Sequence, residues 1–457
     1  MKKFLAVFAV LAIVAISSAA MAEITMGGSY DIRSRAFDNL NMTKNTSAVD
    51  SGDARDTQNR IRIDVNAKAG DNLKGKLQLE HDFGSAFSDW GAHENYSTSS
   101  LPSSGTDRRE GLGFREAWMQ FDLPGIPVNI KAGHQLLQLG NGWFFRSQHY
   151  GTDAWVVTNV TGKNTIGFVN LKISEGQTYS ATTTMTSNIT STNIASSDDV
   201  DAYVLLDVFK INDTNAVGID ITSIRDRRSA LATPGSETDL MNLGLNYNGK
   251  VGPLALKAQV DIQSGKAKDV APGVDSKFKG NQIVIEGSMP MDALTLKFWL
   301  ARGSGDDANS TSPDTKEMQT VMDIDPHYTF LYEYKTITAA GRRNSGFANT
   351  TALGLGAMFA ASKNLSVGGN LWYLKATEKT NVAGNFGTNF AYGAPDDAIG
   401  YEIDLMLNWK LYDNLTWNWV AGYFAPGDVY KGTYTPTGQE AGTEATTGIQ
   451  GILSYKF

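Results

Sequence analysis

Long stretches of strict alternation between apolar and polar residues constrain this chain most. From Leu254 to Gln263, leucine, alanine, valine and isoleucine alternate with lysine, glutamine and aspartate. Such a period of two indicates a β-strand with one dry face and one wet face. The alternating stretches run for about 9 to 13 residues, which suits a tilted crossing of a bilayer; strands of soluble proteins average about five or six. The pattern recurs at 23–37, 60–67, 73–83 and 399–411.

Short and long connections alternate between these stretches. A soluble β-sandwich has no reason to sort its loops by side, whereas a transmembrane barrel has short periplasmic turns and long extracellular loops. We therefore predict an all-β fold, a transmembrane antiparallel β-barrel of about 18 strands. The short turns are expected at 69–72, 124–127, 162–164, 212–215, 249–253, 290–293, 362–364 and 413–414. The long connections are expected near 38–57, 84–110, 140–152, 176–198, 227–238, 265–278, 303–349, 378–397 and 425–444.

The first residues have the pattern of a cleavable export signal. Lys2 and Lys3 precede an apolar run from Phe4 to Ile16, and the segment closes with the small-x-small pattern of 20–22. The apolar run is too short for a comfortable membrane helix, so a retained anchor is the weaker alternative. We predict a signal peptide at residues 1–22, followed by an outer-membrane β-barrel at residues 23–457.

Composition excludes several classes of protein. Removing the two lysines of the signal leaves 38 basic against 48 acidic residues, a net charge of −10. Such a chain lacks the basic excess that would make nucleic acid a partner. Because the chain contains no cysteine, disulfides, thiolate metal sites and covalently attached haem are excluded. We expect no cofactor.

The C-terminal stretch carries the most specific local feature. Ile449, Leu453, Tyr455 and the terminal Phe457 share one face. The arrangement resembles the assembly signal of outer-membrane proteins, which implies the barrel assembly machinery as a partner. On the same apolar face, aromatic residues are expected to form a girdle at the level of the lipid head groups: Trp409, Trp417, Trp419, Tyr423 and Tyr455.

Charged residues that alternate with lipid-facing ones should point into the lumen, because lysine or arginine at the bilayer midplane costs about 2–4 kcal/mol. Acids such as Asp207 and Asp220 are placed there by the same argument. An uneven wall of this kind would bias which ions pass, or its charges would simply pair with one another. The pore-lining residues predicted in this way are Arg33, Arg35, Arg60, Arg62, Lys74, Lys76, Glu80, Glu116, Lys131, Asp261, Glu286, Glu402 and Asp404.

The connection at 303–349 is unusually long and carries apolar and aromatic residues from Met322 to Tyr334. A freely solvated loop does not favour such residues, so we expect this segment to fold partly into the pore mouth and constrict it. Enzyme interpretations are weaker. The histidines, at positions 81, 93, 134, 149 and 327, show no metal-ligand spacing, and we expect neither a metal nor a catalytic residue.

Two segments resemble a known family. Residues 120–135 with 140–143, and 400–409 with 422–427, are similar to strand and hairpin signatures of the alginate-export type of outer-membrane porins. That resemblance implies an 18-stranded barrel. The chain departs from the family pattern at His134, where an arginine is expected, and at Leu139, where an aromatic is expected. The whole chain also resembles the abundant porins of delta-proteobacterial metal reducers.

These observations predict an outer-membrane porin of a Gram-negative cell, a channel for passive diffusion of ions and small hydrophilic solutes. Outer-membrane lipid and lipopolysaccharide are expected to surround it, and a homotrimer is a further expectation. Two alternatives remain open. One is a dedicated conduit for an anionic polysaccharide, and the other is a structural barrel that supports an extracellular electron-transfer complex.

Overall fold

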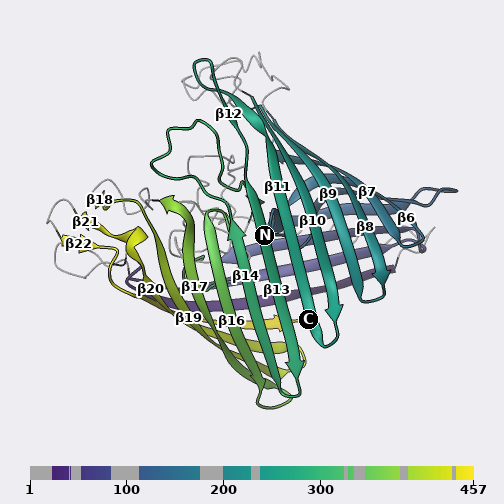
Figure 1. Cartoon of the computed structure of the whole chain (residues 1–457). Helices are drawn as coiled ribbons and strands as arrows, with labels where there is room; N and C mark the ends of the chain where they lie inside the picture. The colour runs from purple at the N-terminus through teal and green to yellow at the C-terminus, as the bar shows by residue number, and fades with distance from the viewer. Residues whose placement is uncertain are drawn as a thin grey trace, which may run out of the picture.

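Eighteen strands of the described residues join edge to edge into a closed antiparallel ring (Figure 1). The ring closes because β1 pairs with β2 on one side and with β23 on the other. In order around the ring the strands are β1 (Glu23–Asp38), β2 (Ala54–Lys68), β3 (Leu73–Phe83), β4 (Gly113–Asp122), β5 (Val128–Gln138), β6 (Phe145–Thr161), β7 (Asn164–Ser174), β8 (Val200–Asn212), β9 (Asn215–Asp226), β10 (Thr238–Val251), β11 (Leu254–Ala271), β13 (Asn281–Met291), β14 (Leu294–Gly303), β16 (Thr350–Ala360), β17 (Leu365–Thr380), β19 (Asp396–Tyr412), β20 (Leu415–Pro426) and β23 (Thr446–Lys456).

The structure is a computed structural model, and no helix among its described residues is long and apolar enough to span a membrane. The predicted signal peptide, His93 and His327 lie outside the described residues. The residues that the structure describes are 23–40, 42, 53–83, 113–174, 199–227, 237–323, 328–333, 345–380, 390–434 and 439–457.

The predicted strand number and the positions of all eight short turns are confirmed. Several predicted long connections overlap strands, and the overlap is largest in two of them. β6 begins at Phe145, inside the predicted connection 140–152. β11 runs on to Ala271 and turns back as β12 (Val274–Lys277), inside the predicted connection 265–278. Polar residues occupy both faces of this hairpin, so the alternation that marks a membrane strand is absent there.

The two faces of the wall differ in the way that the alternation predicts. Large apolar side chains are exposed on the outer face, for example Leu355 at 65% and Leu405 at 62%. Buried side chains, both polar and apolar, lie on the enclosed face, among them Trp372. The expectation that Asp207 points inward is wrong, because it shares the outer face with its strand neighbours Leu205 and Phe209, which are both exposed.

Short elements supplement the ring at the end where the long connections lie. β15 (Val321–Met322) pairs in parallel with the start of β6. A separate small sheet contains β18 (Phe390–Tyr392), β21 (Gly432–Tyr434) and β22 (Gln439–Ala441). A single turn of 3-10 helix, η3 (Asp428–Tyr430), buries Val429 and Tyr430. These elements lie at one end of the barrel, and at the opposite end the described strands are joined by tight turns.

Candidate functional site

Three guanidinium groups converge on one carboxylate on the enclosed face of β2, β3 and β4. Arg62 Nε lies 2.6 Å from Glu80 Oε2, and Nε of Arg60 and of Arg115 each lie 3.7 Å from the same oxygen. Arg60 and Arg62 share a face because they are two residues apart on one strand. Glu80 is 7% exposed. This part of the wall therefore gathers three positive charges around Glu80.

Sequence reasoning missed Arg115. Strict alternation from Glu116 places Arg115 on the lipid face, but the β3–β4 register shifts beside Gln78 and both residues are buried on the enclosed side. The Arg115 guanidinium donates to Gln78 Oε1 and to the backbone carbonyls of Gln148 and His149, at 2.5, 2.6 and 2.9 Å. The bulge is a backbone irregularity, which the pattern of residue types does not reveal.

A second charged group lies closer to the short turns. Lys76 Nζ is 2.6 Å from Glu116 Oε1 and 3.4 Å from Asp64 Oδ1. Trp118 Nε1 donates to Glu116 Oε2 at 2.9 Å. Lys131 Nζ lies 4.1 Å from the centroid of a Trp118 ring, in a cation–π contact. The predicted lumen residues of this region are thus paired with one another while keeping their charges on the enclosed face.

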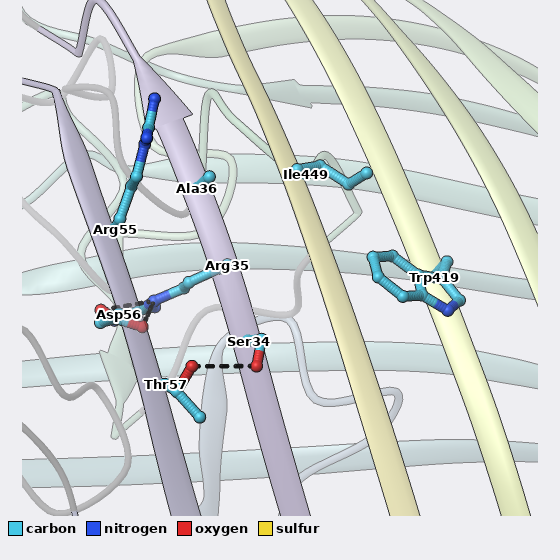
Figure 2. A pocket seen from close by; sticks show the side chains of 8 residues that line it. All are labelled: Ser34, Arg35, Ala36, Arg55, Asp56, Thr57, Trp419 and Ile449. Carbon is cyan, nitrogen blue, oxygen red and sulfur yellow. Dashed lines mark hydrogen bonds and ion pairs between the residues drawn. The ribbon is translucent and has the colours of Figure 1, made fainter.

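Towards the long connections, Arg33 and Arg35 continue the basic side of the wall. Arg35 Nε is 2.8 Å from Asp56 Oδ1, an ion pair drawn in Figure 2. Arg33 donates to Gln58 Oε1 from Nε at 3.1 Å. On the outer face of the same two strands, Ser34 and Thr57 are joined by a hydrogen bond of 3.0 Å between their hydroxyl oxygens.

The remaining predicted lumen residues also lie on the enclosed face. Asp261, Glu402 and Asp404 are buried, at 0%, 0% and 2% exposed. Glu286 is half-buried, and Lys74 is exposed near a short turn. Acidic groups are therefore buried on β9, β11 and β19, away from the arginines of β1 to β4.

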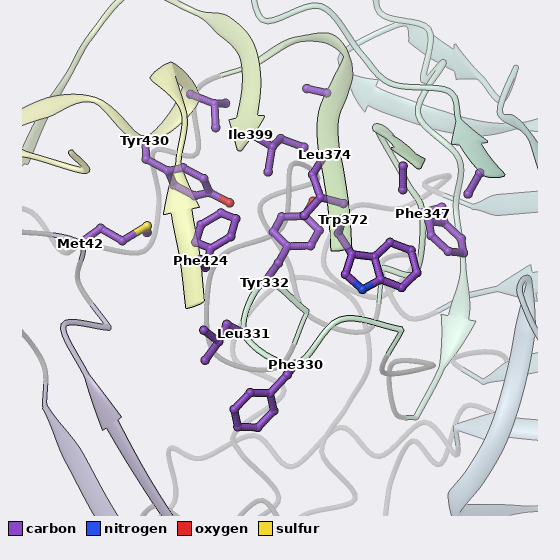
Figure 3. Packing of buried hydrophobic residues seen from close by; sticks show 14 of the residues in the cluster. Met42, Phe330, Leu331, Tyr332, Phe347, Trp372, Leu374, Ile399, Phe424 and Tyr430 are labelled. Atoms are coloured by element: carbon purple, nitrogen blue, oxygen red, sulfur yellow. The ribbon is translucent and has the colours of Figure 1, made fainter. Parts of the chain in front are cut away.

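The connection between β14 and β16 packs against this enclosed face. Phe330 and Leu331 donate their backbone N–H groups to Glu402 Oε1, at 2.7 and 2.6 Å, and Tyr332 donates to Oε2 at 2.8 Å. Leu331 and Tyr332 are 0% exposed and pack in an apolar cluster that includes Phe424 (Figure 3). We call residues 328–333 the inner segment.

A second anchor holds the same connection near the other side of the ring. The Asp323 carboxylate accepts backbone N–H groups of Gln148, His149 and Tyr150 on β6, at 3.1, 2.8 and 2.7 Å. β6 and β19 lie on nearly opposite sides of the ring. The described parts of the predicted connection 303–349 therefore reach into the lumen from both anchors, as the apolar residues after Met322 suggested.

The C-terminal residues lie where their pattern predicted, on the outer face. Ile449, Tyr455 and Phe457 are exposed, and Leu453 is half-buried. The Phe457 backbone joins the last strand to the first, because its carbonyl accepts the Gly28 N–H at 2.9 Å and its N–H donates to Gly28 O at 3.1 Å. Their role as an assembly signal stays a prediction.

Within the described part of the chain, no group of three or more histidine, cysteine, aspartate or glutamate side chains is arranged to hold a metal ion. His134 lies on the outer face, with Nδ1 2.7 Å from Asp153 Oδ1. His149 is buried beside the arginine cluster. The two histidines come from opposite faces of the wall and do not form a common site.

Comparison with known proteins gives one family. A sequence model described as "Gram-negative porin" matches residues 9–379. A BenF-like porin from Pseudomonas fluorescens Pf-5 has a similar structure, with 10% identity, a TM-score of 0.55, and coverage of 96% of this chain and 100% of that one. Pseudomonas aeruginosa OccK2 (OpdF), solved in complex with glucuronate, is 11% identical with a TM-score of 0.53, and the match covers 94% of this chain and 98% of that one. Pseudomonas aeruginosa OpdK with vanillate is 10% identical with a TM-score of 0.50, and the match covers 94% of this chain and 98% of that one. No curated protein sequence matches the chain.

Proposed function

The chain belongs to the Gram-negative porin family, and we propose that it is a porin whose narrowed lumen favours small anions. Members of this family are channels of the outer membrane rather than enzymes, and this chain allows passive diffusion of ions and small hydrophilic solutes. The preference among solutes goes beyond the family assignment. It rests on the distribution of charge and on the inner segment.

The convergence of Arg60, Arg62 and Arg115 on Glu80 is the observation that carries the proposal. Three guanidinium groups lie within 4 Å of one carboxylate oxygen, and this concentration of positive charge attracts anions. Buried acids lie elsewhere around the ring, on β9, β11 and β19, so the charge of the wall is uneven and creates a transverse field across the lumen. A small anion is therefore drawn to the side of the lumen formed by β2 to β4.

The inner segment is what makes the field effective. A charge acts on a passing ion over roughly a Debye length, about 8 Å at physiological ionic strength. A wide, water-filled lumen would leave most solutes beyond that distance. Because the inner segment and Asp323 are held against opposite walls, the passage is narrower than the ring of strands, and solutes pass within reach of the wall charges.

Planar-bilayer recording tests the proposal directly. Purified protein is inserted in a bilayer with a potassium chloride gradient, and the reversal potential is measured. An anion preference gives a reversal potential displaced towards the chloride equilibrium potential. A reversal potential near the potassium value would reject the preference while leaving the channel function in place.

A conduit for an anionic polysaccharide is the second candidate, carried by the resemblance of 120–135 to the alginate-export type. In the structure, Gln135 Nε2 donates to the Ala154 carbonyl at 3.0 Å, and His134 lies on the outer face. The side chains of these two matching residues therefore contact the strands of the wall and are not directed at a solute in the lumen. A polysaccharide conduit predicts saturable block of the current by alginate, whereas block of the small-anion porin by alginate does not saturate.

The third candidate, a structural barrel around an electron-transfer partner, predicts no conductance for the purified protein and co-purification with a haem protein. We also propose that residues 1–22 are removed on export and that the barrel assembly machinery recognises the C-terminal residues. N-terminal sequencing of the membrane-extracted protein tests the first of these. Chemical cross-linking in the membrane tests whether barrels associate as trimers.

A further inference from the structure

A row of polar side chains crosses four adjacent strands at one level of the enclosed wall. In register, Asp220 of β9 lies opposite Gly244 of β10, Gly244 opposite Asp261 of β11, and Asp261 opposite Gln282 of β13. Asp220, Asp261 and Gln282 are 4%, 0% and 2% exposed. Two carboxylates thus lie on alternate strands with a glycine between them.

The glycine brings the carboxylates towards each other. A Cβ atom placed on Gly244 would lie 2.5 Å from Asp220 Oδ1. The Asp220 side chain therefore lies across the space that any larger residue at position 244 would occupy, on the side of Asp261. Thr222 holds it there by donating its hydroxyl to Asp220 Oδ2 at 3.2 Å.

The row carries two negative charges that no basic side chain balances. Asp261 accepts hydrogen bonds from the amides of Asn242, Gln259 and Gln282, at 3.0, 2.8 and 2.7 Å. These donors are neutral. No lysine or arginine in the described part of the chain forms an ion pair with Asp220 or Asp261. Buried carboxylates without a counter-charge are costly, so a bound cation would relieve the row of a substantial penalty.

Two amide oxygens at the row also have no partner. Asn242 Oδ1 and Gln282 Oε1 are buried and accept no hydrogen bond within the described residues. Their side chains are 1% and 2% exposed, and both amides already contact Asp261 through nitrogen. Rotating either amide by half a turn about its last torsion exchanges nitrogen for oxygen at that contact. Carboxylates with amide oxygens are the donor set of a hard cation such as Ca²⁺, which tolerates irregular geometry better than Mg²⁺.

We propose that Asp220 and Asp261, together with the amide oxygens of Asn242 and Gln282, bind a calcium ion in the wall of the barrel. The site lies beneath the connection between β5 and β6. Gln259 Oε1 accepts the Asn141 N–H at 2.8 Å, and Gln259 Nε2 donates to Asp261 Oδ2 at 2.8 Å. Occupation of the site therefore stiffens this connection inside the lumen.

Calcium binding by the purified barrel is the direct test. Protein in detergent is stripped with EDTA and then equilibrated with radioactive calcium, and the bound calcium per chain is counted. We expect one saturable site in the wild type, and binding about tenfold weaker or weaker still in Asp220→Asn and in Asp261→Asn. The matched control is Asp275→Asn, which removes an equal charge from the exposed β11–β12 hairpin and leaves this site intact. Equal calcium binding by the wild type and Asp220→Asn overturns the proposal.

Thermal unfolding distinguishes lost binding from a damaged fold. In EDTA, Asp220→Asn should unfold at a higher temperature than the wild type, because the substitution removes repulsion between two buried carboxylates. In millimolar calcium the wild type gains stability and the variant does not, so the difference between them shrinks or reverses. A wild type whose unfolding temperature is the same in EDTA and in calcium overturns the proposal.

Discussion

The backbone N–H of Leu331 donates to Glu402 Oε1 at 2.6 Å, although 71 positions separate the two residues in the chain. A carboxylate of the wall thus holds a turn of the lumen connection by its main chain rather than by its side chains. Hydrogen bonds to charged groups contribute about 1.5–3 kcal/mol each, and leaving such donors buried without an acceptor costs a similar amount. This anchor sets where the inner segment lies.

Glu402→Gln should release the inner segment without opening the wall. Glutamine keeps the size of the side chain but has one acceptor oxygen for the three N–H donors, so we expect docking to weaken by about 3 kcal/mol. Single-channel conductance should rise and fluctuate more than in the wild type. Glu286→Gln is the control, because Glu286 is a half-buried acid on the same face and contacts Lys257 at 3.8 Å instead of the inner segment. Identical conductance of the two variants would contradict the anchor.

Acidification should tighten the other anchor. Burial raises the pKa of Asp323 above its ordinary value, and this effect outweighs the backbone N–H groups of Tyr150, His149 and Gln148, which lower it. The Asp323 carboxyl group therefore holds its proton more tightly when the connection is docked than when the connection is released. Docking strengthens as the pH falls from above the raised pKa towards about 3.9, the ordinary aspartate value.

Conductance should accordingly fall as the pH is lowered through that window in the wild type. Asp323→Asn is neutral at every pH, so this part of the pH dependence should disappear in the variant. Other lumen acids titrate in both proteins, and only the difference between the two conductance profiles reports on Asp323. Superimposable profiles would show that Asp323 does not control the connection.

Arg62→Gln should reduce the anion preference. Arg62 is the member of the arginine cluster with the most accessible side chain, at 20% exposed. One unit charge about 8 Å from an ion in water contributes about 0.5 kcal/mol, which is about a twofold change in relative permeability. The reversal potential in a salt gradient measures this change in relative permeability. Arg55→Gln removes an equal charge from the outer face of the same strand, and its reversal potential should match the wild type.

Phe457→Ala, which keeps the backbone hydrogen bonds of residue 457 with Gly28, should impair assembly more than stability. Its ring is 56% exposed on the lipid side, so its loss leaves no buried cavity in the finished barrel. We expect less heat-modifiable, folded protein in outer membranes, with a nearly unchanged unfolding temperature for the fraction that assembles. Phe359→Ala removes another exposed outer aromatic, at 49%, from an internal strand. If both variants assemble equally poorly, the terminal position has no special role.

Alternation was sufficient to place most of the wall. It located the strands on both sides of the Asn212–Asn215 turn, and it assigned Glu402 to the wet face and Tyr401 to the dry face. It failed where the backbone departs from a regular strand. The bulge beside Glu116 moved Arg115 inward, and Asp207 kept the outer face although a carboxylate there is costly.

The contents of the lumen were beyond the reach of the pattern. Alternation with a period of two predicts which side of a strand is enclosed. It does not predict which distant segment fills the enclosed space. The hydrogen bonds of Asp323 to His149 and of Tyr332 to Glu402 join residues 174 and 70 positions apart. Only the apolar character of the residues after Met322 hinted that this connection is not solvated.

The seam between the first and last strands pairs Tyr30 with Tyr455, and that pairing has a consequence for biogenesis. One edge of β1 pairs with β2, but its other edge has no partner until the end of the chain has been delivered. Contacts between residues so far apart form slowly, and an open sheet with two bare edges invites aggregation in the meantime. The polypeptide must therefore be escorted in an extended state across the periplasm, and its commitment to the native topology comes with its last few residues.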